Sequence, residues 1–400
     1  MVSITESVEL LPKEASEQVK KGKGGFNIGI PKETDDQEKR VLLTPEAVRL
    51  LTNNGLKVVV ESEAGKQSKF TDKEYSDAGA KVVYSPKEAL ETEVVLKVEP
   101  PTIEEINHML PGACLISALQ IGRQNAEYIH ALNAKRITAV SFENLEDKVG
   151  GMPVVRAMSE IAGSTVMLIA SEYLSSVSHG KGLILGGVTG VPPTQVVIIG
   201  AGTVAEYAAR TALGLGANIK VFDNHIYKLR RVKQLLGQQV FTSTIDNITL
   251  AQALKEADVV IGALRAEKGR NKIVVTEEMI AAMMPGSVVI DVSIDQGGCI
   301  ETAEMTSHSK PTYLKHDIIH YCVPNIASRV SRTASVALSN IFTPILLQMS
   351  DLKGAEEMIF NYKWFMKGVY TYRGSLTNAH LARKFLMTHK ELQLLLAARY

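Results

Sequence analysis

Short apolar runs alternate with amphipathic stretches along most of the chain. The run 196–199, Val-Val-Ile-Ile, consists of β-branched residues, which is typical of a strand buried on both faces of a parallel sheet. Similar runs predict strands at 26–30, 57–61, 81–84, 94–98, 114–119, 137–142, 219–222, near 240, at 258–262, at 287–294 and within 312–323. Strands that alternate with helices predict parallel sheets covered by helices.

The stretches between these runs carry helix signals. Thr44, Pro45 and Glu46 supply an N-cap, a proline at the first helical position and an acid in the first turn. We expect further helices near 73–78, 86–91, 102–109, 124–134, 203–213 and 226–236, and two more capped by Thr249 and Thr276. The fold class that follows is α/β, with two Rossmann-like domains, each a mostly parallel sheet flanked by helices and joined by long helices.

Two long helical patterns suggest where the domains meet. One covers 154–177, and the other opens near Ser331 to Thr333 and would be kinked at Pro344. We therefore expect an N-terminal extension at 1–25, one domain made of 26–153 plus 332–400, and a second domain at 154–331.

A glycine motif follows the strand at 196–199. Gly200 permits a tight turn, Gly202 lets the backbone approach a pyrophosphate, and Ala205 lets the next helix pack close to the strand. Asp223, 21 residues beyond Gly202, ends the second strand, where a carboxylate can accept hydrogen bonds from a ribose and repel a 2′-phosphate. Alone the motif indicates only a turn, but with strand, helix and acid in register it predicts an NAD site. We therefore expect 154–331 to be the NAD-binding domain and 26–153 plus 332–400 to be the substrate domain.

Composition narrows the class of protein. The chain of 400 residues is 45% hydrophobic and 22% charged with a net charge of +1, so neither a nucleic acid nor a membrane surface is favoured as a partner. No uninterrupted apolar run approaches the roughly 18 residues that span a bilayer, and residues 1–21 lack a signal peptide's apolar core. Cys114, Cys299 and Cys322 are interpreted as buried free thiols in a reducing cytoplasm, and we expect no metal.

Over roughly residues 26–380, the sequence resembles the alanine dehydrogenases and the NAD-binding subunit of proton-pumping nicotinamide nucleotide transhydrogenase. The resemblance rests on the order and spacing of several blocks: Ile-Pro-Lys-Glu-Thr at 30–34 with Arg-Val at 40–41, Leu-Lys-Val at 96–98, Met-Ser-Glu-Ile-Ala-Gly at 158–163, Gly-Val-Thr-Gly-Val at 187–191, the glycine motif, the block at 291–299 and His-Tyr-Cys-Val-Pro-Asn at 320–325.

The resemblance implies roles for three charged residues. Arg40 and Lys97 would hold the substrate carboxylate and carbonyl, which agrees with guanidinium and ammonium chemistry. From sequence alone, Arg40 could equally be a solvated residue of a charged loop, whereas Lys97 interrupts an apolar strand and must be paired or functional. Asp295 follows a buried strand at the end where ligands bind, although it could merely cap the turn at Gly297.

Further positions match the family's cofactor site. Ser159 and Asn325 correspond to residues that line the cofactor, although either could be a local cap, and Asn325 is also expected at the substrate. The full set expected to bind the cofactor is Ser159, Gly200, Gly202, Thr203, Val204, Ala205, Asp223, Lys228, Asp295 and Asn325.

Two departures from the family bear on the chemistry. Gln120 stands where the family carries a catalytic His, and glutamine can hydrogen-bond a carbonyl but cannot transfer a proton. The catalytic candidates are Lys97, Asp295 and Gln120. Either Lys97 and Asp295 carry the proton transfers alone, or the substrate or the rate differs from that of the family. The segment 264–267, Leu-Arg-Ala-Glu, replaces an apolar loop usual near the nicotinamide.

The resemblance implies NAD-dependent oxidative deamination of L-alanine to pyruvate and ammonium in the cytoplasm, by a homo-oligomer that is often a hexamer. A transhydrogenase-type NAD(H)-binding subunit is the first alternative, but only 35 positions separate Asp223 from Asp258, without room for that subunit's longer insertion. A catalytically weakened NAD(H)-binding regulator is the second, motivated by Gln120 and the N-terminal extension.

Overall fold

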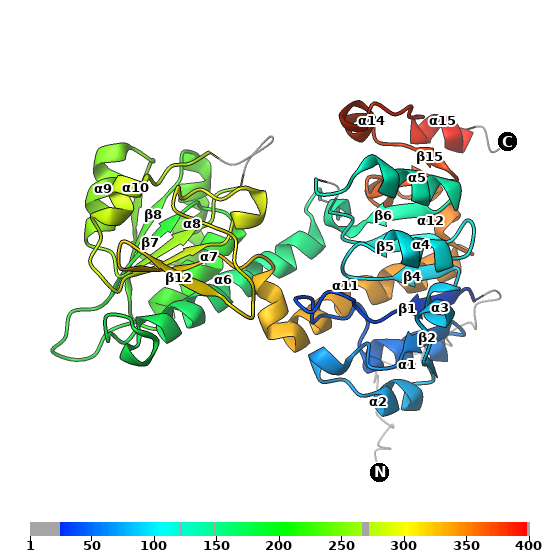
Figure 1. The fold of residues 1–400 in the computed structure, drawn as a ribbon, viewed down its shortest axis with the longest axis horizontal. Coiled ribbons are helices and arrows are strands. Elements are labelled where there is room, and N and C mark those ends of the chain that lie inside the picture. Colours follow the sequence, from blue (N-terminus) through cyan, green and yellow to red (C-terminus); the bar gives the residue numbers. More distant parts are fainter. Residues whose placement is uncertain (1–24, 121, 148, 266–271, 398–400) are drawn as a thin grey trace, which may run out of the picture.

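Two sheets lie side by side, joined by two long helices, α6 (Pro153–Leu174) and α11 (Ser331–Asp351) (Figure 1). This computed structural model describes residues 25–120, 122–147, 149–265 and 272–397. Almost all of the N-terminal extension, and Ala266 and Glu267 of the expected nicotinamide loop, lie outside the described residues. The predicted α/β fold class, with two mostly parallel sheets flanked by helices, is confirmed.

The first sheet has the order β15-β14-β6-β5-β4-β1-β2-β3. Its parallel strands are β1 (Asn27–Ile30), β2 (Lys57–Glu61), β3 (Lys81–Val83), β4 (Val94–Leu96), β5 (Cys114–Ser117) and β6 (Thr138–Ser141). The helices around it are α1 (Pro45–Asn53), α2 (Asp72–Asp77), α3 (Pro86–Leu90), α4 (Ile103–His108), α5 (Ala126–Ala134), α12 (Ala355–Asn361), α13 (Lys363–Met366), α14 (Ala379–Phe385) and α15 (Leu392–Ala397).

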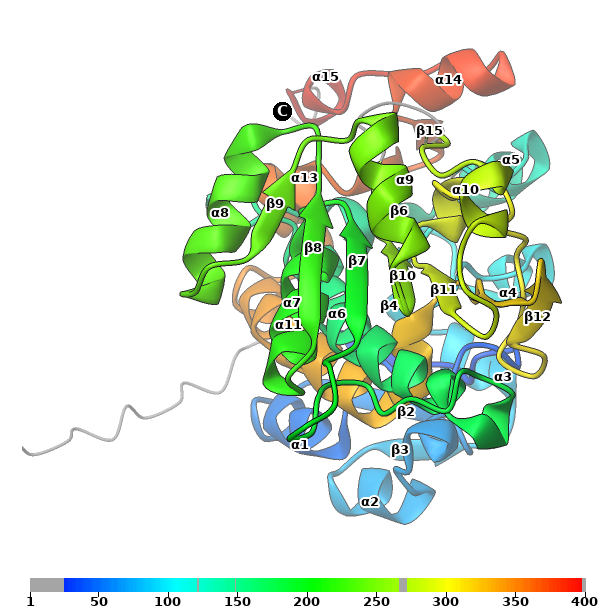
Figure 2. The same cartoon turned by 90° about the vertical axis from the view of Figure 1, so that its left-hand side faces the viewer.

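The second sheet has the order β12-β13-β11-β10-β7-β8-β9, and Figure 2 shows it from its own side, with β8, β7 and β10 next to one another. Its strands are β7 (Gln195–Ile199), β8 (Asn218–Phe222), β9 (Phe241–Ser243), β10 (Val259–Gly262), β11 (Val288–Asp291), β12 (Thr312–Lys315) and β13 (Ile318–Tyr321). Its helices are α7 (Thr203–Gly214), α8 (Ile226–Leu236), α9 (Asn247–Lys255) and α10 (Glu277–Ala281). All pairs are parallel except that of β12 with β13.

The β-branched run of β7 is buried on both faces, as its sequence predicts. Val196 and Ile198 join the apolar cluster under α6 and α7, whereas Val197 and Ile199 face the opposite cluster, which includes Leu250 of α9. Successive side chains of a strand point to opposite faces, so an uninterrupted apolar run requires a covering layer on each.

Both sheets share one topology at their centres. From β3 to β6 the first sheet follows the 3-2-1-4-5-6 order of the Rossmann fold, and from β9 to β13 the second does the same. The order reverses between β1 and β4 in one sheet and between β7 and β10 in the other. Ligands of such sheets bind beyond the carboxyl ends of the strands at these switch points.

The structure corrects two details of the sequence prediction and confirms a third. The strands β14 (Val369–Tyr372) and β15 (Ser375–Leu376) were not foreseen, and β14 extends the first sheet by pairing antiparallel to β6. Thr249 does not cap its helix, because Asp246 is the N-cap and its side chain accepts the Thr249 N–H. Thr276 is an N-cap as predicted.

Two helical stretches, Pro153–Leu174 and Ile326–Asp351, are long and apolar enough to span a bilayer by length and composition alone. Here both contribute to the cores. Ile169 and Leu174 of α6 pack under the second sheet, and Leu338 and Phe342 of α11 pack under the first. These side chains are therefore covered by protein, although only 44% of each apolar stretch is buried and Leu168 of α6 is exposed.

Candidate active site

Polar side chains follow the carboxyl ends of four neighbouring strands in the first sheet. Glu33 comes after β1, Lys97 and Glu99 after β4, Gln120 after β5 and Glu143 after β6. Parallel strands end at one edge of a sheet, so the chain brings these groups to the switch point from four distant segments.

Arg40 is buried, so the interpretation of it as a solvated loop residue is wrong. Its guanidinium donates from Nε to Oε1 of Glu38 at 2.7 Å and from NH2 to Oε2 of Glu38 at 2.5 Å, and NH1 lies 3.3 Å from Sδ of Met158 in α6. Burial opposes ionisation of Glu38, but the charge and hydrogen bonds of Arg40 outweigh it and lower the Glu38 pKa. This bidentate pair fixes the plane of the guanidinium.

Lys97 lies directly beyond β4 and is 1% exposed. Its Nζ is 3.1 Å from Oε2 of Glu33 and 3.6 Å from Oε1 of Glu105. Burial lowers its tendency to carry charge, but the two carboxylates more than compensate and raise the Lys97 pKa. Burial raises the pKa of Glu33 to about 7, although the Lys97 charge opposes the shift. The expectation that Lys97 is paired is confirmed.

Gln120 takes part in a polar chain between two charged residues. Its Nε2 donates to Oε2 of Glu99 at 2.5 Å, and its Oε1 accepts from NH1 of Arg123 at 3.3 Å. Its backbone N–H points to Oε2 of Glu143 at 3.3 Å. At the position where the resemblance places a His, an amide therefore connects the acidic Glu99 to the basic Arg123.

Asp295 comes from the other domain, in the turn after β11. The carboxylate that fixes this turn is Asp291, which accepts hydrogen bonds from the N–H groups of Ser293 and Cys299 at 2.9 and 2.8 Å. The Asp295 side chain is solvent-exposed, yet nearby protein atoms raise its pKa against the opposing charge of Arg123. Its charge in turn helps to raise the pKa of Glu143, although burial is the main cause there. Asp295 thus faces the group of residues around Gln120.

A second contact joins the domains at Asn325, which begins the turn after β13. Its Nδ2 donates to Oε2 of Glu38 at 2.7 Å, and it makes no side-chain cap, so the interpretation as a local cap is wrong for this residue. Ser159, next to Met158 in α6, lies beside the Arg40 contact in the sequence. The structure therefore brings Arg40, Lys97, Gln120, Asp295 and Asn325 to the junction of the two sheets, whereas the role of Ser159 stays a prediction.

The glycine motif is placed at the switch point of the second sheet. Gly200 has φ +111°, and a Cβ there would lie 2.4 Å from the carbonyl oxygen of Ala263, after β10. A Cβ on Gly202 would meet nothing within 4 Å. Gly202 is the N-cap of α7 and Thr203 and Val204 open this helix, whose first N–H groups have no side-chain cap. The buried Ala205 permits close packing, so the open space and the helix end fit a bound pyrophosphate.

Asp223 lies at the end of β8, beside this turn. It is 3% exposed, and its Oδ2 accepts the Ala201 N–H at 2.8 Å while Oδ1 accepts the His225 N–H at 2.7 Å. The carboxylate therefore also fixes the glycine turn, a role that the sequence did not indicate. Lys228 lies in the first turn of α8, with its Nζ 5.9 Å from the ring centre of Tyr227.

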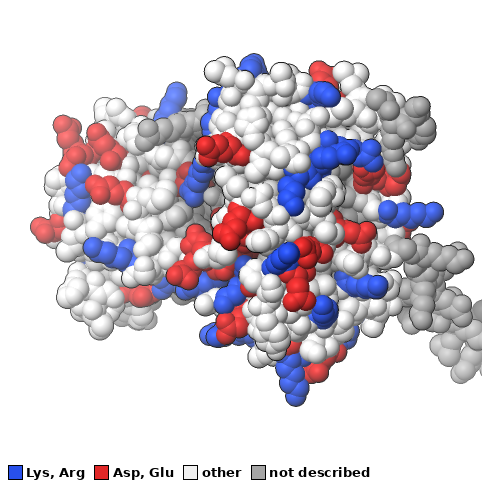
Figure 3. Space-filling model, turned by 45° about the vertical axis from the view of Figure 1, so that its right-hand side comes forward, with Lys and Arg blue, Asp and Glu red and all other residues white. Residues whose placement is uncertain are grey.

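Sequence reasoning missed the acids that surround the two cations. Glu33, Glu38, Glu99, Glu105 and Glu143 all contact or face the groups described above. Glu38 lies in the same charged run as Arg40, and only the fold reveals that these two residues of the run are buried. Over the surface seen in Figure 3, basic and acidic side chains are interspersed. Among the described residues no group of three or more His, Cys, Asp or Glu is arranged to hold a metal ion.

These features define a two-domain α/β protein with a dinucleotide-type glycine turn in one domain and two buried cations at the facing end of the other. Family models for the N-terminal and C-terminal domains of alanine dehydrogenase/PNT match residues 29–162 and 166–379. The chain belongs to the alanine dehydrogenase/PNT family, as the sequence motifs indicated.

Curated relatives and solved structures give the same result. The chain is 38% identical to an alanine dehydrogenase of Bacillus subtilis (strain 168) over 89% of this chain and 94% of the relative. It is 37% identical to one of Methanococcus maripaludis over 89% and 95%. A solved L-alanine dehydrogenase superposes with a TM-score of 0.85 at 35% identity, covering 90% of this chain and 99% of that one. A transhydrogenase from Sinorhizobium meliloti superposes with a TM-score of 0.76 at 26% identity, over 88% and 99%.

Proposed function

We propose that this protein catalyses the reversible, NAD-dependent oxidative deamination of L-alanine to pyruvate and ammonium. The observation that carries the proposal is the placement of two buried cations, Arg40 and Lys97, at the switch point of one sheet, with the glycine turn at the switch point of the other. The names and extent of the similar relatives support alanine as the substrate.

We assign the substrate to residues 26–153 plus 332–400 and the cofactor to 154–331. Arg40 would bind the substrate carboxylate, with Glu38 holding its guanidinium in one plane. Lys97 would stabilise the oxygen on which charge develops. The bound cofactor supplies the hydride acceptor, and the protein orients the substrate Cα toward it.

Asp295 enters from the cofactor domain, where its exposed carboxylate can orient or deprotonate the water that attacks the imine. Its raised pKa suits a group that exchanges protons. Asn325 and Ser159 would lie where substrate and cofactor meet. Gly200, Gly202, Thr203, Val204 and Ala205 would hold the pyrophosphate, and Asp223 and Lys228 would lie near the adenosine.

We propose NAD rather than NADP as the cofactor. A buried carboxylate at Asp223 favours ribose hydroxyls and repels a 2′-phosphate.

The experiment that tests the proposed deamination measures NADH formation by the purified protein with NAD⁺ and a panel of amino acids that includes L-alanine, serine and glycine. Turnover that is best with L-alanine is expected, whereas turnover with none of them would favour the NAD(H)-binding regulator.

The transhydrogenase-type alternative is disfavoured by the second domain. Between Asp223 and Asp258 there are α8, β9 and α9, so this segment has no room for a longer insertion.

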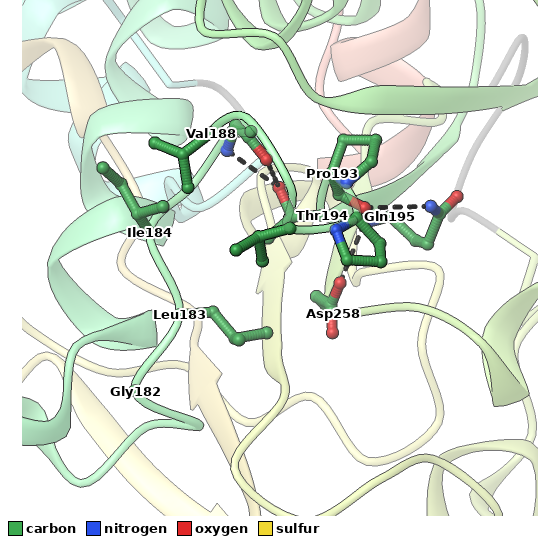
Figure 4. Close-up of a pocket in the computed structure, with 12 residues that line it drawn as sticks. Gly182, Leu183, Ile184, Val188, Pro193, Thr194, Gln195 and Asp258 are labelled. Atoms are coloured by element: carbon green, nitrogen blue, oxygen red, sulfur yellow. Dashed lines mark hydrogen bonds between the residues drawn. The ribbon is translucent and has the colours of Figure 1, made fainter.

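A homo-oligomer is part of the proposal, and exposed apolar residues of the segment before β7 support it. Ile184 and Val188 are 64% and 53% exposed and line the pocket in Figure 4. This pocket lies at the amino ends of β7 and β10, and therefore at the edge of the sheet opposite the glycine turn. Light scattering of the purified protein tests this.

A cytoplasmic location also remains a proposal. Cys114, Cys299 and Cys322 are free and buried, which suits a reducing compartment. Fractionation of the native host would test it.

A further inference from the structure

Gln120 has an unusual backbone conformation as well as an unusual position. Its φ is +42°, in the left-handed region that costs a non-glycine residue on the order of 1–2 kcal/mol. Such conformations persist where surrounding contacts fix them, and they concentrate at functional sites. Here the backbone N–H is directed at Glu143 while the side chain reaches Glu99, so the strained residue presents its amide to one carboxylate.

Glu99 is the carboxylate that accepts the hydrogen bond from the Gln120 amide. It is half-buried and follows the catalytic candidate Lys97 by two positions, and the positive charge of Arg40 acts to lower its pKa. The other charged groups that act on it are Glu33, Asp35 and Glu38 from the loops after β1, and Glu99 in turn acts on Lys97. Through Gln120 it is also connected to Arg123, the base that faces Asp295.

We propose that Glu99, oriented by Gln120, is the acid–base group that transfers protons in this active site, in place of the imidazole that the resembled family has at position 120. The inference rests on the proposed deamination. Its geometric basis is the contact of 2.5 Å between Nε2 of Gln120 and Oε2 of Glu99 and the partial exposure of Glu99 at the switch point. Burial, followed by the negative charge of Glu38, raises the Glu99 pKa to about 7, which suits proton exchange near neutral pH.

The proton balance can be written for the hydrolytic half of the reaction. Hydride transfer to the cofactor leaves the amino acid as an iminium ion. Of the two roles open to Asp295, orienting the water or deprotonating it, only the first remains. Water forms a C–O bond to the iminium carbon, and the proton released by that water moves to the ionised Glu99 carboxylate, giving a neutral carbinolamine. Glu99 returns this proton to the amine nitrogen and accepts the hydroxyl proton as the C–N bond breaks. The products are the keto acid and ammonia, which takes the proton from Glu99 and leaves as ammonium.

The direct test compares pH profiles of kcat/KM for L-alanine in wild type and Glu99→Gln. The variant side chain can still accept from Gln120 but does not titrate. The wild type should show an ascending limb near pH 7, because the base must be ionised. In Glu99→Gln we expect kcat to fall by about 10²- to 10⁴-fold, with little change in KM, and the limb to disappear. Glu88→Gln, at an exposed carboxylate paired with Lys81, is the matched control and should behave as wild type.

Two further variants separate proton transfer from a structural role. The double variant Glu99→Gln with Gln120→His should regain activity with a limb near pH 6.5, because it restores a titrating group at the same place. Glu33→Gln removes the other acid whose pKa lies near 7. In this variant the ascending limb of the kcat/KM profile should persist but move to lower pH, because Glu99 loses a negatively charged neighbour.

The outcomes distinguish this inference from the proposed function. An unchanged limb in Glu99→Gln, or a limb that vanishes in Glu33→Gln instead, would overturn the role of Glu99 and leave the deamination intact. A double variant no more active than Glu99→Gln would also count against it. Absence of any amino-acid turnover in wild type would overturn the deamination itself, and with it this inference.

Discussion

Asn325 donates a hydrogen bond from Nδ2 to Oε2 of Glu38 at 2.7 Å, across the junction of the two domains. The same oxygen accepts from NH2 of Arg40 at 2.5 Å. A residue of the cofactor domain therefore shares a carboxylate oxygen with the guanidinium expected to bind the substrate. A rearrangement of the turn after β13 that moves Asn325 would therefore act on Arg40 through the Glu38 carboxylate.

Replacing either buried cation should weaken the amino-acid step. For Arg40→Ala and Lys97→Ala we expect a lower kcat/KM for the amino acid, equivalent to a loss of roughly 2–4 kcal/mol of transition-state stabilisation. Each change removes a charged partner and leaves a buried carboxylate uncompensated. Steady-state kinetics and NAD⁺ titration are the measurements, and NAD⁺ affinity should change little. Near-normal turnover in both variants would mean that the carboxylate is bound elsewhere.

The two glycines of the motif should respond differently to alanine. Gly200→Ala places a Cβ 2.4 Å from a backbone oxygen at φ +111°, so we expect a lower melting temperature. Gly202→Ala meets no protein atom within 4 Å and has an ordinary φ of −81°, so the free protein should keep its stability while NAD⁺ affinity falls. Thermal melts with and without NAD⁺ check both. Equal NAD⁺ affinity in Gly202→Ala and wild type would be evidence against pyrophosphate at this turn.

Asp223 should set cofactor choice. Asp223→Ser removes a ribose acceptor and a charge that repels a 2′-phosphate, so the ratio of kcat/KM for NAD⁺ to that for NADP⁺ should fall toward unity. The change also removes the acceptor of the Ala201 N–H, so part of the loss with NAD⁺ is structural, and Asp223→Asn serves as the control that keeps an acceptor without the charge. A wild-type protein that uses both cofactors equally well would be incompatible with this role.

Glu33 should make stability depend on pH. Its folded-state pKa of about 7 exceeds the unfolded value of about 4.3, so the folded protein holds the extra proton between these values. The contribution of Glu33 to the free energy of unfolding is therefore fully present below about pH 4 and is lost as the pH rises through 7. Glu33→Gln cannot titrate, so its stability relative to wild type should improve by on the order of 2 kcal/mol from pH 5 to 8. Denaturant unfolding at both pH values measures this, and a constant difference would show that Glu33 has an ordinary pKa.

The sequence predicted the central strands because their β-branched runs can be buried only inside a covered parallel sheet. It did not predict the short strands β14 and β15. β14 pairs with β6, yet it begins at Val369, 228 positions after β6 ends at Ser141. It identified Arg40 and Lys97 through the family motifs. It could not identify Glu38 as the partner of Arg40, because both lie in a charged run that is typical of solvated loops. It could not identify Glu33 as the partner of Lys97 either, because these residues follow different strands and meet only in the folded chain.

The proposed deamination is best checked in reverse, by ammonium-dependent oxidation of NADH by pyruvate, because that reaction requires the whole site and both substrates. We expect the purified protein to consume NADH only when pyruvate and ammonium are both present, and to form one L-alanine per NADH oxidised. Consumption of NADH with pyruvate alone, or no consumption while NADH still binds, would contradict the proposed deamination.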